Sequence, residues 1–563
     1  MAPPAALPPQ LGGYAALLRL CALLLALTMA AVVGVIAQDV GAKWRRARHW
    51  EERRERAEAV AREIAASSAG AIEGLLAEQR AAAAAPSLAP GSFPLAERLA
   101  RLDDGPPAWR AYAAAVVAAL RAAGCPQAAI DEAHRWNRPS FTGRRRPAAA
   151  VLAEALGSPA RRLQACAVVA SEALAAAQLH AEIARSQTLA SEADCATARV
   201  LLLTYPWNGF ASNFGVVAGA LISAIRMGRV LVLDEATPWA YNGGPLCAGA
   251  PTQWECYFRR FGTCTSANAG ISAEERAAAP PAKPGGGGGG PPRVVRLKQE
   301  PPYARLFYHS HLTALRPPPP YHRFGVAWWR AHHFAALWRL QPHVQATVAR
   351  TLAASGLAGL DAQFLAWHVR HGDKVTEGRG LYRATKYARE LQQLAAAHPA
   401  VRHVLLASDN PAVLDAAAGM PAFAPGGSGG LRLFWLRDRE RLGGSAVEAA
   451  AVAQANPGVA YTLALDAITN VAALSESALA LGIFHSNFGR LASELRYVKG
   501  YAVAPFVFKD APACAAARHA HPDRDSYFVP NATAWYLPLR AARARLFGLP
   551  PGFFVANDSE TGG

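Results

Sequence analysis

The regular alternation of strand and helix patterns between residues 199 and 500 constrains the fold of this chain more than any other feature. Short runs of Val, Leu, Ile and Phe recur between longer segments whose apolar residues have helical spacing. Strands separated by helices form parallel sheets, and strands that are apolar throughout are typical of a sheet covered on both faces. The sequence therefore predicts an α/β protein with two lobes, each built on a doubly wound parallel sheet.

Two sets of elements carry this pattern. In the first lobe, we expect strands at residues 200–204 and 229–234 on either side of a helix at 212–227, which together form a βαβ unit. In the second lobe, the expected strands are residues 364–369, 401–407, 431–435 and 478–484, and the main helices are residues 326–354, 385–398, 462–475 and 490–498. Six consecutive glycines, Gly285 to Gly290, predict that residues 274–302 form a flexible insertion.

The chain before the first lobe contains an apolar run and Ala-rich helices. Residues 20–37 are uncharged and long enough to cross a bilayer, so we expect a membrane anchor after a short tail of residues 1–19. A cleaved signal peptide is the alternative, although the charged segment that should precede it is missing. The remaining expected regions are residues 38–190 (stalk and accessory helices, with a hairpin of 108–123 and 148–184), 191–315 (first lobe), 316–500 (second lobe) and 501–563 (C-terminal segment).

Signals for the orientation of this anchor conflict. Basic residues directly after it favour a cytosolic location of the following chain, namely Lys43, Arg45, Arg46 and Arg48. The glycosylation sequons at Asn531 and Asn557, and the seven of eight cysteines that follow the run, favour an oxidising lumen instead. Cys247 with Cys256 could close a short loop and Cys195 with Cys264 a longer one. Because seven is an odd number, at least one of these cysteines must stay unpaired, and the spacing does not identify which.

Composition restricts the class of partner. The chain has 58 Lys and Arg against 41 Asp and Glu, a formal charge of +17, which favours an anionic partner such as a nucleotide, an acidic glycan or a membrane surface. Biased base composition of the gene is the alternative explanation. The basic residues are scattered and no groove-reading module is recognisable, so we do not expect nucleic-acid binding. No G-x-x-x-x-G-K-[ST] loop occurs, and no G-x-G-x-x-G fingerprint stands between a predicted strand and a predicted helix, which disfavours kinases and dinucleotide enzymes.

Polar residues follow three predicted strands of the second lobe. The carboxyl ends of parallel strands meet at one edge of a sheet, where ligands bind in open α/β folds. Arg370 offers a planar fork of donors, and Ser486 precedes helix amides, so the two together suit a diphosphate. An ordinary helix cap is the alternative for Asp409. The residues at this edge are Arg370, His371, Asp373 and Lys374 after the first strand, Asp409 after the second, and Ser486 after the last.

Three other acidic features have both a functional and an ordinary interpretation. Asp466 lies in a predicted helix and could accept hydrogen bonds from a nucleobase, or simply face solvent. Glu377 is a candidate general base in the loop after Lys374, or a surface glutamate. Asp523-Arg524-Asp525 is similar to metal-binding D-x-D motifs but lies away from the sheet edge, so we expect no metal.

These motifs, in this order, resemble the α1,6-fucosyltransferases of N-glycan cores and their bacterial chitin-oligosaccharide relatives, glycosyltransferase family 23. The resemblance covers residues 194–497. Its motifs are Asp194-Cys195, Ala198-Arg199, Leu233 to Tyr241, Phe258-Arg259, Thr263-Cys264, His368-Val369-Arg370, Asp373-Lys374-Val375, Ser408-Asp409, Leu465-Asp466, and Ser486 with Arg490 and Glu494.

The resemblance implies a two-lobed GT-B-like enzyme of the Golgi membrane, single-pass type II with a luminal catalytic region. It would move fucose from GDP-fucose to the N-glycan core GlcNAc in α1,6 linkage, with inversion and without a metal or other cofactor. Arg370 and Ser486 would hold the β-phosphate, His368 and Asp466 the guanine, and Tyr241 the nucleotide from the first lobe. His371 and Asp409 would complete the donor site, and Asp373, Lys374 and Glu377 would serve catalysis with Arg370. Cys195 and Cys264 would form a family disulfide.

The chain departs from the family pattern at three positions. His371 replaces a second arginine, Asn410 replaces an acid, and Glu377 stands one residue closer to Lys374 than usual. Transfer to a chitin oligosaccharide or a protein hydroxyl, and a catalytically silent glycan-binding or scaffold protein, are therefore the alternatives. A homodimer formed through the stalk helices is a further expectation.

Overall fold

The computed structural model describes a discontinuous set of residues, all of them in one compact unit of the chain, Ile64–Gly563. The described residues are 106–122, 124–137, 162–205, 209–281, 292–297, 317–318, 321–357, 364–371, 384–397, 401–424, 430–436, 456–477, 479–482, 486–499 and 506–508. The expected anchor at residues 20–37 lies outside them.

The first sheet has three parallel strands in the order β2-β1-β3. These are β1 (Val200–Leu203), β2 (Val230–Leu233) and β3 (Val294–Leu297), and helix α8 (Phe210–Arg226) connects the first two. Every residue of β1 and β2 is buried, which explains their unbroken apolar sequence. The predicted βαβ unit is therefore present.

The expectation of a flexible insertion at residues 274–302 is wrong for part of that range. Its first residues lie in helix α9 (Ala273–Ala278), and residues 294–297 form β3, which pairs with β1. Ser272 caps α9, and the Arg293 guanidinium binds Glu275 of α9 at 2.6 Å. The side chain of Arg229 also donates to the carbonyl oxygens of Pro292 and Arg293. These contacts hold both ends of the segment against the sheet, whereas the glycine run lies outside the described residues.

The second sheet has five parallel strands in the order β6-β5-β4-β7-β8. Its central strand, β4, is buried along its whole length and pairs residue by residue with β5, Val369 opposite Ser408. One strand, β8, was not predicted, and it extends the sheet beyond residue 500. The strands are β4 (Phe364–Val369), β5 (His403–Ser408), β6 (Arg432–Phe434), β7 (Leu479–Gly482) and β8 (Phe506–Phe508).

The single helix expected at residues 326–354 is in fact two, α11 (Gly325–Leu337) and α12 (Pro342–Ala354). The chain leaves helical geometry at Trp338, and Leu340 then pairs with Phe258 in an isolated antiparallel bridge. Pro342 begins α12 at a position where a missing N–H costs nothing. A tertiary contact with the first lobe thus interrupts a sequence whose helical periodicity is continuous.

Other helices agree more closely with expectation. Helix α16 (Pro457–Ser475) begins five residues early because the Asn456 side chain accepts from Gly458 N–H and Val459 N–H. Among the described helices, α16 is the one that is long and apolar enough to cross a membrane. However, 72% of its most apolar window is buried within the protein, which is typical of a core helix. The remaining helices of the second region are α13 (Ala388–Ala397), α14 (Pro411–Ala418) and α17 (Asn487–Lys499).

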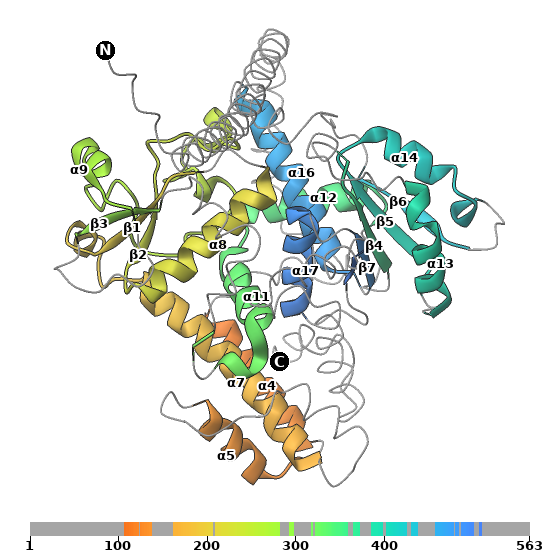
Figure 1. Cartoon of the computed structure of the whole chain (residues 1–563), viewed down its shortest axis with the longest axis horizontal. Helices are drawn as coiled ribbons and strands as arrows, with labels where there is room; N and C mark the ends of the chain where they lie inside the picture. The colour runs from red at the N-terminus through yellow and green to blue at the C-terminus, as the bar shows by residue number, and fades with distance from the viewer. Residues whose placement is uncertain are drawn as a thin grey trace, which may run out of the picture. The chain divides into compact units, whose positions relative to one another are not determined.

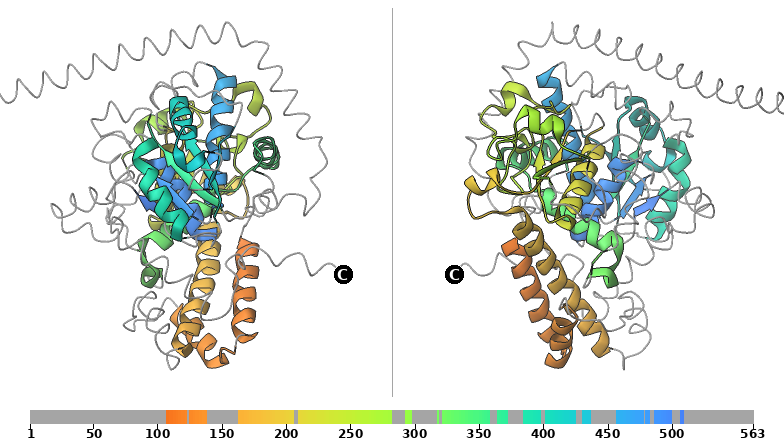
Figure 2. Two further views of the ribbon diagram at one scale, coloured as in Figure 1. Left: turned by 90° about the vertical axis from the view of Figure 1, so that its right-hand side faces the viewer. Right: turned by 60° about the vertical axis from the view of Figure 1, so that its left-hand side comes forward.

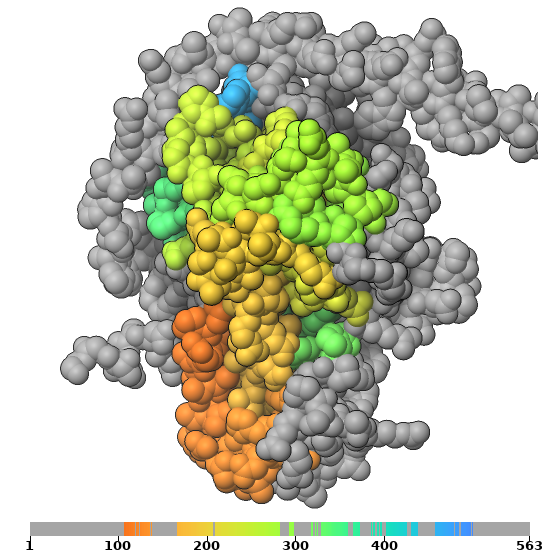
Figure 3. All heavy atoms as spheres, turned by 90° about the vertical axis from the view of Figure 1, so that its left-hand side faces the viewer, coloured from red at the N-terminus to blue at the C-terminus, as the bar shows by residue number. Residues whose placement is uncertain are grey.

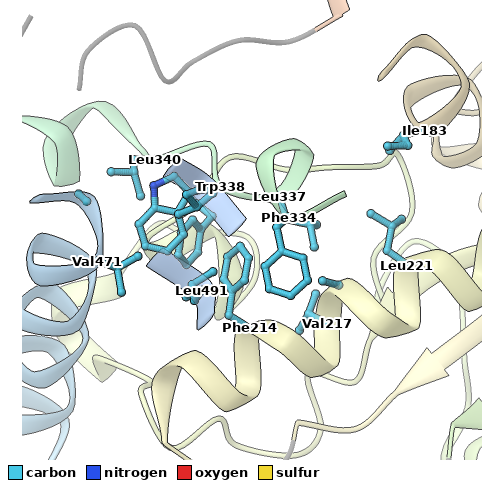
Figure 4. Close-up of a cluster of buried hydrophobic side chains, with 14 of the residues drawn as sticks. Ile183, Phe214, Val217, Leu221, Phe334, Leu337, Trp338, Leu340, Val471 and Leu491 are labelled. Atoms are coloured by element: carbon cyan, nitrogen blue, oxygen red, sulfur yellow. The ribbon is translucent and has the colours of Figure 1, made fainter. Parts of the chain in front are cut away.

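One apolar core joins the first sheet's helix to four helices of the following region. Figure 1 shows α8 beside α11 and α17, and the close-up in Figure 4 shows Phe214 of α8 beside Phe334, Trp338 and Leu491. Leu491 belongs to α17 and Val471 to α16. A separate core lies around the second sheet and includes Leu365, Trp367 and Leu406. The helices α11, α12, α16 and α17 therefore share their core with the first sheet's helix, so the two lobes are not independent at this layer.

The accessory region forms the expected helical pairing, with one helix more than predicted. Helices α4 (Pro106–Ala122) and α7 (Arg162–Gln187) run side by side in both views of Figure 2, and α5 (Gln127–Trp136) also packs on α7. A disulfide between Cys125 and Cys166 closes this group. In Figure 3 the side chains of these helices form one continuous surface with those around the first sheet. Helix α7 also contacts α11, where His180 Nε2 lies 3.1 Å from His332 Nδ1.

We predict that removing the Cys125–Cys166 bridge destabilises the protein more than removing Cys247–Cys256. The first bridge spans 41 residues and the second only 9, and a longer loop loses more unfolded-state entropy on closure. The double serine variant at Cys125 and Cys166 should lose about 2–4 kcal/mol of unfolding free energy. Urea unfolding of both double variants measures this, and equal or reversed losses would contradict it.

Candidate functional site

The carboxyl edge of the second sheet places a cationic side chain in a fixed orientation. Arg370 directly follows β4, and its guanidinium binds the carboxylate of Asp409, which directly follows β5. The other oxygen of that carboxylate accepts the His371 N–H at 3.0 Å. Because β4 and β5 are parallel neighbours in register, the residues that follow them lie side by side. Asp409 holds Arg370, and 18% of the Arg370 side chain remains exposed.

His368 lies one pleat before Arg370 and is almost fully buried, with 4% exposed. Its ring stacks on Phe488 of α17 at 5.2 Å between centroids. Burial lowers the pKa of His368 to about 4, while nearby Asp409 raises it and Arg370 lowers it further. The imidazole is therefore neutral near pH 7, and its Nδ1 has no hydrogen-bond partner among the described residues. A neutral ring with an open nitrogen can bind a ligand group by hydrogen bonding.

Tyr241 reaches the same region from the first lobe. It follows β2 in a loop, is 5% exposed, and packs edge-on against Phe210 and Trp239. Burial raises the pKa of its phenol to about 12, an effect opposed by the backbone N–H of Phe210 and by the charge of Arg370. Its hydroxyl is thus close to the first residue of α8 and within the field of Arg370. The first lobe contributes both a phenol and a helix N-terminus to this site.

The N-terminus of α17 completes the arrangement. Ser486 is buried, with 2% exposed, and its Oγ accepts the Gly489 N–H at 3.5 Å. In the next residue, Asn487 Nδ2 donates to Ser212 Oγ of α8, and Asn487 Oδ1 accepts from Arg490. The first turns of α8 and α17 are therefore bonded to each other. Both helices direct positive dipole ends to this place.

Asp466 stands on the half-buried face of α16, with its Oδ1 shielded from solvent. The same helix supports the loop that carries Tyr241. A Cβ added to Gly243 would lie 2.9 Å from the ring of Tyr461, and one added to Gly244 would lie 2.7 Å from Pro457 Cβ. Gly244 also has a φ of 54°, which favours glycine. The loop that carries Tyr241 therefore packs closely on α16, the helix that carries Asp466.

These features together form a site for an anion with an attached polar group. Arg370 and two helix N-termini supply positive potential, and such termini bind phosphate groups through their free N–H groups. His368 and Tyr241 supply hydrogen-bonding groups of different types within the field of Arg370. The arrangement suits a phosphorylated ligand that also carries a base or a sugar.

Several predicted site residues lie outside the described residues. These are Asp373, Lys374 and Glu377, the glycosylation candidates Asn531 and Asn557, and the D-x-D residues Asp523 and Asp525. Their roles stay predictions. Within the described ranges, no three His, Cys, Asp or Glu side chains come together as metal ligands.

Sequence reasoning gave no role to several residues that the structure places here. Ser212 and Phe210 lie at the start of α8, and Phe488 and Arg490 in the first turn of α17. The sequence feature that could have identified these residues is their position at the start of helices that follow buried strands, because anions bind at such helix starts. The disulfides Cys195–Cys264 and Cys247–Cys256 are present as expected, and the second closes the loop after Tyr241.

The fold and site define an α/β protein with two parallel sheets and a cationic edge. The sequence matches no protein-family model and no curated protein. Solved structures with limited similarity include the NodZ α1,6-fucosyltransferase soaked with GDP-fucose and fucosyltransferase NodZ from Bradyrhizobium. Both are 15% identical, with TM-scores of 0.32 and 0.33, and the alignments cover 52% and 53% of this chain and 92% and 93% of theirs. This overlap assigns neither a family nor an activity.

We predict that His368 makes the protein sensitive to mild acid. Its pKa is about 4 in the folded state against about 6.5 unfolded, so only the unfolded chain takes up this proton as pH falls between those values. Stability should fall by about 1.4 kcal/mol per pH unit from this group across that window. Urea unfolding between pH 7 and pH 5 should therefore show a shallower decline for His368→Gln than for wild type. Identical slopes would contradict the buried neutral imidazole.

Proposed function

We propose that this chain is an inverting glycosyltransferase that takes fucose from GDP-fucose. The observation that carries the proposal is the meeting of Arg370, Tyr241 and the N-termini of α8 and α17 at one sheet edge. A diphosphate is the leaving group that such a set of donors would stabilise. The order of motifs in the sequence supports the choice of donor.

The neighbouring groups support a nucleotide whose base is guanine. His368 presents an open ring nitrogen, and Asp466 is a carboxylate that can accept from the donors on the Watson–Crick edge of guanine. The proposed site takes residues from both lobes, because Tyr241 belongs to the first and Arg370 to the second. Both phosphate and base would therefore be recognised.

The proposed reaction is one in-line displacement. The acceptor hydroxyl oxygen attacks the anomeric carbon of fucose as the bond from that carbon to the β-phosphate oxygen breaks, and the electron pair leaves with GDP. Glu377 takes the acceptor proton and Lys374 and Asp373 assist this step, while Arg370 and Ser486 stabilise charge on the departing diphosphate. His371 and Asp409 hold the turn that carries Arg370. Attack from the opposite face inverts the anomeric centre.

The acceptor and location belong to the same proposal. We assign transfer to the N-glycan core GlcNAc in α1,6 linkage, by a type II protein of the Golgi membrane whose catalytic region is luminal. Three disulfides among the described residues support an oxidising compartment. A chitin oligosaccharide or a protein hydroxyl is the alternative acceptor.

The test is a transfer assay with the chain from residue 38 onward. GDP-fucose and other GDP-sugars are each offered with N-glycans, chitin oligosaccharides and a protein acceptor, and the products are identified by mass spectrometry. A fucosylated N-glycan supports the proposal. Transfer of another sugar only, or GDP binding without turnover, would overturn it in favour of the alternatives.

We predict that Arg370→Lys lowers turnover on the order of 10²–10³-fold, because lysine keeps the charge but loses the two-pronged contact to developing phosphate charge. Arg402→Lys is the matched control, since Arg402 is exposed and precedes β5 at the opposite edge of the sheet. Steady-state kinetics at saturating acceptor, with folding checked by thermal melting, measure the effect. Turnover near wild type in a folded Arg370→Lys protein would refute the phosphate role.

We predict that a chelator leaves transfer unchanged. Arg370 and the two helix N-termini already supply positive potential where a metal would otherwise screen the diphosphate. Initial rates are compared with EDTA and with added Mn²⁺ or Mg²⁺. A loss with EDTA that one metal restores would instead assign a metal role to Asp523 and Asp525.

A further inference from the structure

We propose that Tyr257 is a positioning residue that fixes the backbone of Tyr241, and that the affinity for the nucleotide donor depends on this contact. The inference rests on the proposed function, in which Tyr241 binds the nucleotide from the first lobe. Tyr257 itself touches no ligand and acts only through Tyr241. The inference is carried by one buried hydrogen bond and by the contacts that hold both tyrosines in place.

The hydroxyl of Tyr257 donates to the carbonyl oxygen of Tyr241 at 2.7 Å. Tyr257 is 0% exposed and Tyr241 is 5% exposed, so this hydrogen bond is shielded from water. Burial raises the pKa of Tyr257 well above its usual value, so the hydroxyl stays protonated and remains a donor. A buried carbonyl that loses its donor costs free energy, so the bond favours one position of the Tyr241 backbone.

The phenol of Tyr241 is fixed at its other end. The backbone N–H of Phe210, the first residue of α8, hydrogen-bonds the phenol oxygen, and the Phe210 ring packs edge-on against the Tyr241 ring. The pKa of Tyr241 is about 12, so its hydroxyl is protonated near pH 7. A phenol oxygen that accepts an N–H keeps its own proton for a ligand anion. Movement of the Tyr241 carbonyl would therefore displace a proton donor of the proposed site.

The segment around Tyr257 is itself held by the junction between α11 and α12. The backbone N–H of Gln341 donates to the carbonyl oxygen of Tyr257 at 2.9 Å. The side-chain amide of Gln341 donates to the carbonyl oxygens of Glu255 and Phe258, at 2.9 Å and 3.2 Å. One residue thus binds three carbonyl groups of this short segment. The break in the helix expected at residues 326–354 therefore has a further consequence, because it supplies the support for Tyr257.

One side chain of α16 supports both Tyr257 and the loop of Tyr241. The ring of Tyr257 lies 5.6 Å from the ring of Tyr461, measured between centroids. A Cβ added to Gly243, two residues after Tyr241, would lie 2.9 Å from the same Tyr461 ring. The donor and the acceptor of the hydrogen bond thus belong to segments that pack on a single ring, which keeps their distance constant.

The substitution Tyr257→Phe keeps the ring and removes only the hydroxyl. We expect the affinity for GDP to fall about fivefold, because the loss of one buried hydrogen bond lets the Tyr241 backbone leave the binding position for part of the time. In a Tyr241→Phe background, the same substitution should leave the affinity unchanged, because the hydroxyl that it positions is already absent. A purely structural role for Tyr257 would lower the affinity by the same factor in both backgrounds.

Tyr321→Phe is the matched control. Tyr321 is 1% exposed, precedes α11, and lies beside Glu182 and Arg185 of α7, so it also carries a buried phenol but has no contact with Tyr241. Its substitution should lower the melting temperature, as Tyr257→Phe should, and leave the GDP affinity unchanged. Isothermal titration of the full chain with GDP and with inorganic pyrophosphate, beside thermal melting, gives all of these values.

A second variant covers the case in which Tyr257→Phe does not fold. Gln341→Glu puts an acceptor against the carbonyl oxygens of Glu255 and Phe258, and so loosens the segment from the other side. It should weaken GDP binding in the protein that has Tyr241, and have no effect on binding in the Tyr241→Phe background.

The outcomes separate the inference from the proposed function. Unchanged GDP affinity in folded Tyr257→Phe, or an equal loss in both backgrounds, would overturn the inference and leave the donor site intact. Wild type that binds pyrophosphate but not GDP would overturn the nucleotide donor, while the same set of variants tests the inference with pyrophosphate. Unchanged affinity in Tyr241→Phe would overturn the inference together with the role of Tyr241. Wild type that binds neither ligand would overturn both proposals.

Discussion

The apolar core shared by α8, α11, α16 and α17 is the constraint on which the candidate site depends. Burying one large apolar side chain such as Phe214, Trp338 or Leu491 contributes about 1.5–3 kcal/mol, and this core has many of them. The ion pair of Arg370 with Asp409 is partly exposed, and such pairs contribute at most about 1 kcal/mol. Packing therefore sets where the helix N-termini lie, and the ion pair only sets the direction of one side chain within that frame.

The spacing of apolar residues was sufficient to predict those helices and strands whose burial is encoded within their own sequence. The strands at β1, β2, β4 and β5 and the helices between them were predicted because their apolar spacing reflects burial along their own length. Strand β3 was missed because four residues beside a glycine run carry little pattern. The break between α11 and α12 was also missed, since it follows from the pairing of Leu340 with Phe258, far away in the sequence.

The site was partly predictable for the same reason. Arg370, Asp409 and Ser486 follow strands of one parallel sheet, so their common edge follows from topology. The ion pair between the first two depends on strand order, which periodicity does not determine. The bond between Asn487 and Ser212 joins residues 275 positions apart, and it arises only because the shared core brings two helix ends together. The loop with Glu377 lies outside the described residues, and its role stays a prediction.

The close contact between the Tyr241 loop and α16 restricts how this protein can diversify. Gly243 and Gly244 admit no side chain where they touch Tyr461 and Pro457, so a larger residue in the loop must displace the helix that carries Asp466. A single substitution in the loop would thus disturb both the segment that carries Tyr241 and the helix that carries Asp466. A new ligand preference through this route requires at least one compensating change on α16, and lineages that acquire it should carry paired substitutions in these two segments.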